Sequence, residues 1–369
     1  MAGPRRVRYA DFAAQYAAER ETLLAAVDDV LARGDFIGGA DVAALEGELA
    51  ALCGVPHVVA MNSGTDPLWL ALKCLGVGPG DEVITASNSF VASAAAIAHL
   101  GAVPVFADVG PDQLLDPGAV ARAVTSRTKA IMPVHLTGRV CDMDALRAVA
   151  DAHGLKIVED AAQSIGSLYK GRRSGSFGDA AGFSLHPLKN LNAVGDAGFL
   201  ATADGDLAER VRRLRNHGLA NRDMVVEFGY NTRLDTLQAA VLRTRLPLLP
   251  GVIEARRRNA ELYRQLLDSA HIHNAPCRPH EFNTFHLFVI QADRRDALQA
   301  HLAEQGIGSK IHYPIPIHQQ PAAAPYRDKS GPLPETERQA ARILSLPIHQ
   351  YLTPDDVAHV ADVVNAFYR

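Results

Sequence analysis

Short runs of apolar residues alternate with longer amphipathic segments between about residue 40 and residue 245. The apolar runs predict strands at 57–61, 82–86, 103–107, 130–134, 156–158, 182–185 and 198–201. The amphipathic segments predict helices at 42–52, 66–75 and 91–100. Short apolar strands separated by such helices are typical of a largely parallel sheet that is covered on both faces. Ligands of such sheets bind beyond the carboxyl ends of the strands.

The pattern changes after Pro247 and the pair Pro250 and Gly251, which we expect to end this first region. The segments that follow predict a helix at 253–267, a strand at 286–291, a helix at 295–305, a proline-rich loop at 312–334 and a final helix at 354–368. We therefore predict an α/β protein of two domains. The large domain covers residues 1–249, including the N-terminal segment, and a smaller α+β domain covers residues 250–369.

Composition narrows the classes of function. The chain has 369 residues, of which 48% are hydrophobic, enough for a large core. A net charge of −4 without a block of basic residues argues against nucleic acid or an anionic membrane as partner. No apolar run approaches a membrane span, and no apolar segment follows the N-terminus, so we expect a cytoplasmic protein without a signal peptide. The four cysteines lie far apart and form no CxxC pair: Cys53, Cys74, Cys141 and Cys277. This spacing disfavours disulfides and a zinc site, which fits the reducing cytoplasm.

Three polar features lie at predicted strand ends. Lys189 follows the strand at 182–185 and a proline, in a constrained loop. Asp160 lies at the end of the apolar run 155–160, and residues 62–66, Asn-Ser-Gly-Thr-Asp, form a turn that opens a helix. A lysine, a strand-end aspartate and a phosphate-type turn are the three protein groups that pyridoxal phosphate needs. The lysine forms a Schiff base with the aldehyde, the aspartate pairs with the pyridinium nitrogen, and the turn holds the phosphate.

Each feature also has a simpler interpretation. A lysine such as Lys189, taken alone, is usually a solvated surface residue. Asp160 could be the N-cap of a helix that starts at residue 161. Ser63 could likewise cap the helix that follows, although free N–H groups at a helix N-terminus also suit a phosphate dianion. The functional interpretation therefore depends on the three features occurring together.

Two further residues are placed to approach a flat cofactor. Gln163 lies three residues after Asp160, so that it could reach the ring hydroxyl from the same side. Phe90 lies just beyond the strand at 82–86, where its ring could stack on the cofactor or simply pack in the core. No P-loop and no GxGxxG occurs, so nucleotide triphosphates and NAD have no motif support. His271 and His273 lack a carboxylate or cysteine cluster, so we predict no metal site.

Taken in order along the chain, these motifs resemble the DegT-type sugar aminotransferases, which are fold-type I pyridoxal-phosphate enzymes. The resemblance extends from residues 34–38 to residues 344–347, nearly the whole chain. Its motifs, specific in combination and weak singly, are residues 62–66, 159–163, 183–191, 195–196, 229–235 and 312–314. The implied fold is a mostly parallel sheet sandwiched by helices, with a smaller C-terminal α+β domain.

The resemblance implies roles for individual residues. Lys189 would bind the cofactor and shuttle the proton, with Asp160 at the pyridinium nitrogen. The cofactor contacts implied are Gly64, Thr65 and Ser184 at the phosphate, Phe90 on the ring, Gln163 at the ring hydroxyl, and Asn231 from a second subunit. The sugar-nucleotide contacts implied are Arg233, His312 and Tyr313, some of them across the dimer interface.

The sequence departs from the commoner family pattern at three positions, none of which removes a catalytic group. Thr137 stands where an aromatic residue is usual, Ser89 replaces a frequent threonine, and Ala197 replaces a glycine. Thr137 could alter the shape of the substrate site. One branch of the family carries histidine in place of the lysine and performs dehydration, and Lys189 disfavours that branch.

We therefore predict a homodimeric pyridoxal-phosphate aminotransferase that converts a keto-sugar, nucleotide-linked by preference, to an amino sugar with glutamate as donor. A keto-cyclitol of the scyllo-inosose type is an alternative acceptor. A second alternative, from another class, is a non-catalytic regulatory protein that binds the cofactor. The presence of both Lys189 and Asp160 argues against that alternative.

Overall fold

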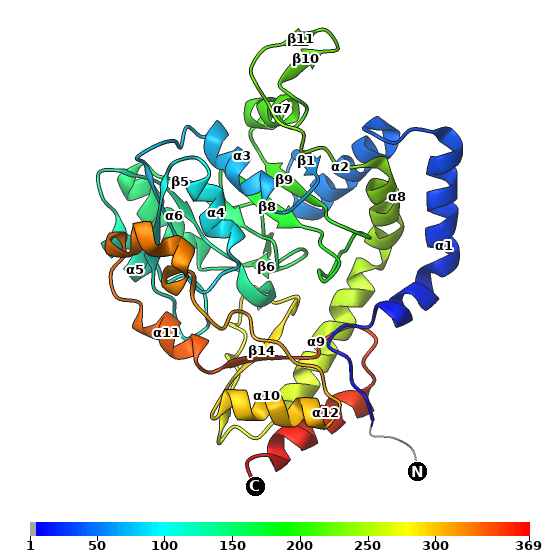
Figure 1. Cartoon of the computed structure of the whole chain (residues 1–369), viewed down its shortest axis with the longest axis vertical. Coiled ribbons are helices and arrows are strands. Elements are labelled where there is room, and N and C mark those ends of the chain that lie inside the picture. The colour runs from blue at the N-terminus through cyan, green and yellow to red at the C-terminus, as the bar shows by residue number, and fades with distance from the viewer. Residues whose placement is uncertain (1–4) are drawn as a thin grey trace.

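The computed structural model describes residues 5–369 and is built around one seven-stranded sheet (Figure 1). The spatial order of its strands is β1-β9-β8-β5-β4-β2-β3. Their bounds are β1 His57–Met61, β2 Glu82–Ala86, β3 Val103–Ala107, β4 Thr128–Met132, β5 Lys156–Asp160, β8 Ala180–Ser184 and β9 Gly198–Thr202. All are parallel except β9, which runs antiparallel to both of its neighbours. The predicted mixed α/β architecture, with a mostly parallel sheet between helices, is confirmed.

Helices cover both faces of this sheet. Successive strand residues point to opposite faces, and in these strands the residues on both faces are apolar. Val158 in β5 packs on one face with α3, α4 and α7, and Ile157 packs on the other with α5 and α6. The helices α2 and α8 extend that second face beside β8 and β9. The bounds of these helices are α2 Gly39–Cys53, α3 Asp66–Cys74, α4 Ala92–Ala98, α5 Pro117–Ala123, α6 Met143–His153, α7 Gly205–Leu214 and α8 Thr236–Arg245.

The reversed strand β9 decides where the connection from β8 lies. Because β9 returns antiparallel beside β8, residues 185–197 form a loop at the carboxyl edge of the sheet. The strands β1 and β5 also end at that edge, since both run parallel to β8. Three loops that are far apart in sequence therefore meet at one edge of the sheet.

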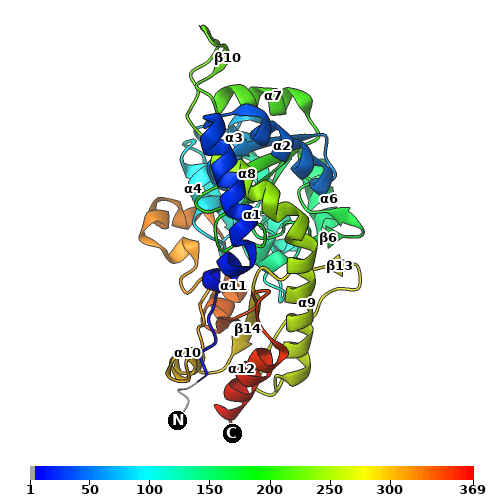
Figure 2. The same cartoon turned by 90° about the vertical axis from the view of Figure 1, so that its right-hand side faces the viewer.

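A smaller antiparallel sheet, in the order β12-β14-β15, lies in the lower part of the molecule (Figures 1 and 2). It packs with its flanking helices around a separate apolar core that includes Phe288, Leu302 and Val360. Its elements are β12 Ile272–His273, β14 Phe288–Ala292, β15 Ile343–Leu346, α9 Leu249–Leu266, α10 Arg295–Glu304 and α12 Pro354–Ala366. The division into domains at residues 249 and 250 stays a prediction.

We expected the prolines at 247 and 250 to end the first region, but the helical structure continues through both. α8 is followed directly by the short 3₁₀ helix η2, Leu246–Leu248, and then by α9. Pro250 lies in the first turn of α9, where the missing N–H would have no intrahelical partner, so proline is tolerated there. The predicted strand at 130–134 was also placed too late: β4 ends at Met132, before Pro133.

The remaining elements lie outside the two sheets and their cores. A long N-terminal helix, α1 Phe12–Arg33, packs beside α8, and the hairpin β10–β11 projects from the top of the molecule (Figure 1). The proline-rich loop expected at 312–334 contains the two 3₁₀ helices η3 and η4 and leads into the short helix α11. The bounds are β10 Leu219–Asn221, β11 Met224–Val225, η3 Ile317–Gln319, η4 Pro321–Lys329, α11 Pro334–Ala340, η1 Leu136–Gly138, β6 Leu168–Tyr169, β7 Arg172–Arg173 and β13 Glu281–Phe282. Over residues 5–369, every helix is too short or too polar to span a lipid bilayer.

Candidate active site

A cavity with about 1120 Å³ of empty space, counting its open mouth, lies at the carboxyl edge of the large sheet. It brings together nine residues that the sequence predicted as site residues: Gly64, Thr65, Phe90, Asp160, Gln163, Ser184, Lys189, His312 and Tyr313. They come from the last residues of β5 and β8, from the loops after β1, β2, β5 and β8, and from the segment before η3. Convergence of five distant segments on one cavity is what a binding site on such a sheet requires.

Lys189 is held in the loop that links β8 to β9. Its backbone N–H donates to the carbonyl of His186 at 2.8 Å, which closes a turn. The side chain is partly open to the cavity, yet the surrounding protein removes much of its hydration. Burial therefore lowers the pKa of Lys189 to about 8, although the nearby charge of Asp160 opposes that effect. A lysine with such a pKa is present in part as the neutral, nucleophilic amine at neutral pH.

Asp160 is the last residue of β5 and is 5% exposed. Its Oδ2 accepts a hydrogen bond from the Ser93 hydroxyl at 2.6 Å, and its Oδ1 accepts one from the Ala162 N–H at 3.2 Å. No helix starts after Asp160, because the next residues form turns, so the helix-cap interpretation is wrong. Two neutral donors fix the carboxylate at the cavity wall, where it can pair with a cationic group of a ligand.

The turn after β1 is packed too tightly for any residue but glycine at position 64. A Cβ on Gly64 would lie 2.5 Å from the Ser184 Cβ. The Ser63 hydroxyl accepts hydrogen bonds from the N–H groups of Thr65 and Asp66, and α3 then begins at Asp66. The Ser184 Oγ accepts from the His186 N–H at 3.3 Å and keeps its own proton to donate. Hydroxyls and a helix N-terminus side by side suit a bound phosphate.

Gln163 has a defined amide orientation. Its Oε1 accepts a hydrogen bond from the Thr137 backbone N–H at 2.7 Å, which leaves the Nε2 donor for the cavity. Thr137 adopts a positive φ of 64°, and this turn aims its N–H at the amide. Thr137, which departs from the family pattern in its side chain, thus positions Gln163 through its own backbone N–H.

Two aromatic rings contribute to the lining of this cavity. Phe90 is 54% exposed, and its ring centroid lies 5.8 Å from that of Tyr313 with a tilt of 41°. The neighbouring His312 ring contacts the Ser345 hydroxyl through Nδ1 at 2.9 Å. Burial, and then the charge of Lys189, lower the pKa of His312 to about 4, so that its ring is neutral at pH 7. These side chains present stacking faces and a neutral imidazole rather than charge.

Asn231 and Arg233 are not part of this cavity. The Arg233 guanidinium donates to the Asn231 Oδ1 at 3.1 Å and to the Asn216 Oδ1 at 3.0 Å. The pair lies on the segment that leads away from the projecting hairpin, after β11. Their predicted contribution to the site of a second subunit therefore stays a prediction.

Three residues of the site went unnoticed in the sequence. Ser93, which contacts Asp160 from behind the cavity lining, lies in an alanine-rich helix. His286 lines the cavity and lies at the start of a predicted strand, so neither position carries a pattern that marks it. His186 adjoins Lys189, and its Nδ1 accepts from the Leu188 N–H at 3.2 Å. Proximity to Lys189 along the chain was the one signal that could have identified His186.

The residues in this cavity fit pyridoxal phosphate. The glycine turn, Thr65 and Ser184 offer neutral donors for a phosphate, and any larger residue at position 64 would displace Ser184 from this place. Asp160 supplies a carboxylate for a ring nitrogen, and Lys189 supplies an amine for an aldehyde. The donor set therefore matches the phosphate, the ring nitrogen and the aldehyde of this one molecule.

Comparison with known proteins agrees with this geometry. The sequence model of the DegT/DnrJ/EryC1/StrS aminotransferase family matches residues 17–365. A "dTDP-3-amino-3,4,6-trideoxy-alpha-D-glucose transaminase" from Streptomyces venezuelae is 44% identical, and the match covers 97% of this chain and 95% of the relative. A "pleiotropic regulatory protein" from Geobacillus stearothermophilus is 42% identical over 97% of this chain and 98% of the relative. The crystal structure of S. venezuelae DesV in complex with a ketimine intermediate has a TM-score of 0.94 and 43% identity, covering 98% of both chains.

Proposed function

This chain belongs to the DegT/DnrJ/EryC1/StrS aminotransferase family, and we propose that it transfers an amino group from glutamate to a nucleotide-linked keto-sugar. The observation that carries the proposal is the convergence of Lys189, Asp160 and the Gly64 turn on one cavity. The enzyme depends on pyridoxal 5'-phosphate, the cofactor of similar aminotransferases. When bound, that cofactor withdraws electrons from the substrate carbon that carries the amino group.

Several residues would hold the cofactor by neutral contacts and one by charge. Asp160, which Ser93 orients, would keep the ring nitrogen protonated. Gly64, Thr65 and Ser184 would bind the phosphate, Phe90 would stack on the ring, and Gln163 would donate from Nε2 to the ring hydroxyl. The support for these assignments is the position of each side chain around the cavity.

Lys189 serves as the proton carrier. Its lowered pKa provides a neutral amine at neutral pH, which takes the proton from the α-carbon of the donor. The resulting ammonium would then give that proton to the cofactor carbon that bore the aldehyde. In the second half-reaction the amine of Lys189 would take a proton back from that carbon and deliver it to the carbon of the keto-sugar. The constrained turn at His186 limits the motion of Lys189 to its own side chain, so that one amine reaches both positions.

The acceptor binds at the mouth of the cavity. His312 and Tyr313 supply a neutral donor and a ring face that suit a sugar diphosphate, and Arg233 supplies charge. The Streptomyces venezuelae relative is named for a dTDP-linked 3-amino sugar, which supports a nucleotide-linked acceptor for this chain. A second copy of this chain would contribute Asn231 and Arg233, because neither lies in the cavity of its own chain.

Substrate titration tests the function. The pyridoxamine-phosphate form of the enzyme is titrated with nucleotide-linked 3-keto and 4-keto sugars, and separately with scyllo-inosose. We expect a nucleotide-linked keto-sugar to restore the absorbance of the pyridoxal form, and the responding sugar identifies the aminated carbon. A response to scyllo-inosose alone would replace the nucleotide sugar by a keto-cyclitol.

The name of the Geobacillus stearothermophilus relative makes a regulatory role the remaining alternative. A protein that only binds the cofactor needs no proton carrier, so the desolvated Lys189 beside Asp160 favours catalysis. Formation of 2-oxoglutarate from glutamate distinguishes the two. Turnover with any keto-sugar supports the enzyme, whereas stable binding without turnover would favour the regulator.

A further inference from the structure

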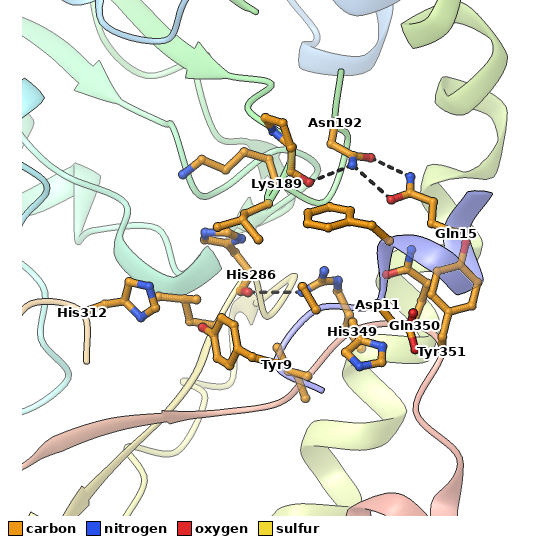
Figure 3. A pocket seen from close by; sticks show the side chains of 17 residues that line it. Tyr9, Asp11, Gln15, Lys189, Asn192, His286, His312, His349, Gln350 and Tyr351 are labelled. Atoms are coloured by element: carbon orange, nitrogen blue, oxygen red, sulfur yellow. Dashed lines mark hydrogen bonds between the residues drawn. The ribbon is translucent and has the colours of Figure 1, made fainter. Parts of the chain in front are cut away.

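A second cavity, with about 610 Å³ of empty space counting its mouth, shares part of its lining with the cofactor cavity, including Lys189. Figure 3 shows the side chains that line this second cavity. The N-terminal segment at Tyr9, helix α9 and the segment before α12 line it. Four residues belong to both cavities and form the boundary between them: Leu188, Lys189, His286 and His312. A ligand near Lys189 therefore has this second space directly beside it.

Polar atoms without partners gather in this second cavity. Among residues 5–369, twelve buried side-chain nitrogen or oxygen atoms lack a hydrogen-bond partner. Four of the twelve line this one cavity: Tyr9 Oη, Arg256 Nε, His286 Nδ1 and His349 Nδ1. A buried polar atom without a partner costs free energy, so a third of them in one place indicates a position that a ligand or water completes.

The contacts of Arg256 favour an anion as the missing partner. Within residues 5–369 four arginines are buried, and three of them pair with a carboxylate: Arg139 with Glu281 at 2.8 Å, Arg245 with Glu19 at 2.8 Å, and Arg295 with Asp296 at 2.6 Å. Arg256, 7% exposed, is the exception, since its Nη1 donates only to the backbone carbonyls of Phe285 and His286. A buried cation without a carboxylate is costly unless an anion reaches it.

The surrounding charges favour an anion as well. Burial lowers the pKa of Arg256 to about 10, so the guanidinium stays charged at neutral pH. Burial, followed by the charges of Lys189 and Arg256, lowers the pKa of His286 well below its usual range, so that its ring is neutral. Among the described residues, Asp11 is the one carboxylate in the lining. It accepts from the Ala14 N–H and from Arg8, both at 3.0 Å, as the N-cap of α1.

The remaining groups give the site its chemistry. Tyr9 Oη can donate toward the same anion as Arg256, and its ring stacks on His312 with centroids 6.0 Å apart. His349 donates from Nε2 to the Arg8 carbonyl at 3.1 Å, which leaves Nδ1 as an acceptor for water or a ligand N–H. Phe12 and Ile348 add apolar wall for a hydrocarbon chain. One guanidinium edge with neutral donors matches a carboxylate, whereas phosphate dianions attract more positive charge.

We propose that this cavity binds the side-chain carboxylate of a dicarboxylic amino donor, with Arg256 and Tyr9 as its donors. The proposal rests on the proposed transaminase function and names how the donor is recognised. The amino carbon lies at Lys189, and the methylene chain passes the boundary at His286. A monocarboxylic donor such as alanine leaves Arg256 without its partner, which is how the site selects glutamate.

The test uses the holoenzyme and glutarate, a dicarboxylate that has no amine to react. Isothermal titration measures its dissociation constant for wild type, Arg256→Gln and the matched control Arg257→Gln. The neighbouring Arg257 donates to the Asn283 carbonyl and stacks on Phe282, outside the cavity. We expect at least about tenfold weaker glutarate binding for Arg256→Gln, from loss of a charge-assisted bond, and no change for the control.

Steady-state kinetics separates donor recognition from general damage. Arg256→Gln should raise the KM for glutamate about tenfold and leave the KM for the keto-sugar unchanged, so that selectivity for glutamate over alanine falls. Tyr9→Phe, which removes only the hydroxyl, should shift the glutamate KM in the same direction and keeps the proposal testable if Arg256→Gln does not fold. Unchanged glutarate binding in both variants, or tighter binding of inorganic phosphate than of glutarate by wild type, would overturn the site. If the site is overturned but the enzyme still turns over glutamate, the transaminase function stands. If Arg256→Gln weakens glutarate binding but the wild type shows no turnover, the function is rejected and the site is retained.

Discussion

Lys189 illustrates how a single environment sets a residue's chemistry. Burial lowers its pKa to about 8, although Asp160 opposes the shift, so the neutral amine becomes the main form above pH 8. A solvated lysine reaches that form only near pH 10.4. Cofactor-free protein should therefore bind pyridoxal phosphate at a rate that rises with pH through about 8 and then levels off. Stopped-flow absorbance measures this rate, with Lys189→Ala as the control that lacks covalent capture. An inflection near pH 10 would mean that Lys189 is solvated.

The carboxylate of Asp160 depends on a serine that no sequence motif marks. Ser93, fully buried, donates to its Oδ2 at 2.6 Å and contacts the Ser89 hydroxyl at 2.7 Å. This bond orients the carboxylate and stabilises its charge, which the ring nitrogen of the cofactor requires. Ser93 is thus a positioning residue that acts through Asp160.

Replacing this serine tests that role. Ser93→Ala should slow the glutamate half-reaction by about tenfold, because a hydrogen bond to a charged group is lost. It should also shift the pH dependence of the cofactor absorbance, which a merely structural change would not do. Ser93→Thr restores the hydroxyl and should recover most of the rate. Ser89→Ala, which removes a hydroxyl one hydrogen bond further from Asp160, should slow the half-reaction less. Asp160→Asn should slow it most. Equal rates in Ser93→Ala and wild type would assign Asp160 another support.

At the scale of elements, helix α1 braces the loop that carries Lys189. Gln15 and Asn192 exchange amide hydrogen bonds at 3.0 and 3.2 Å, and Asn192 also donates to the Pro187 carbonyl at 2.8 Å (Figure 3). From α8, Arg245 donates to the Asn192 carbonyl at 2.7 Å and pairs with Glu19 of α1. The loop is thereby fixed from both helices by buried polar contacts, which are costly to leave incomplete.

Removal of one partner should loosen this brace. Gln15→Ala leaves the Asn192 amide without its partner in a buried place, so the free energy of unfolding should fall by about 1–3 kcal/mol. Hydrogen exchange at residues 186–193 should increase, as measured by mass spectrometry. Glu21→Ala, an exposed position on the same helix, serves as the control and should change neither quantity. If Gln15→Ala lowers stability while exchange in the loop stays constant, α1 supports the fold but not the Lys189 loop.

The elements also show how far the sequence predicts the structure. Strands such as β1, β2 and β3 were predicted to the residue, because a short apolar run between turns has few alternatives. The direction of β9 was not predicted, since a strand buried on both faces has the same pattern in either direction. Nine site residues were predicted because they lie at strand ends or in motifs. Ser93 and Arg256 were missed, because their importance comes from which buried groups they meet, and spacing along the chain does not reveal that.

At the scale of the whole molecule, one part of the chain extends away from its own core. The hairpin β10–β11 projects from the top of the molecule (Figure 1), and its apolar side chains are open to solvent. Phe228, just after the hairpin, is 94% exposed, and Val226 is 53% exposed. Asn231 and Arg233 follow on the same segment, outside the cavity of their own chain. Exposed apolar residues of this kind indicate an interface, and a second copy of this chain is the partner that we propose.

Mixing two inactive variants tests whether the site is shared. In a symmetric dimer, a heterodimer of Lys189→Ala with Asn231→Ala/Arg233→Ala contains one site in which every residue is intact. Random exchange makes half of the dimers mixed, so about a quarter of wild-type activity should return. The matched control pairs Lys189→Ala with Asp160→Asn, both of which line the cavity of one chain, and it should recover no activity. Native mass spectrometry verifies that subunits have exchanged. If exchange is complete and the first mixture stays inactive, Asn231 and Arg233 serve their own chain and the hairpin has another partner.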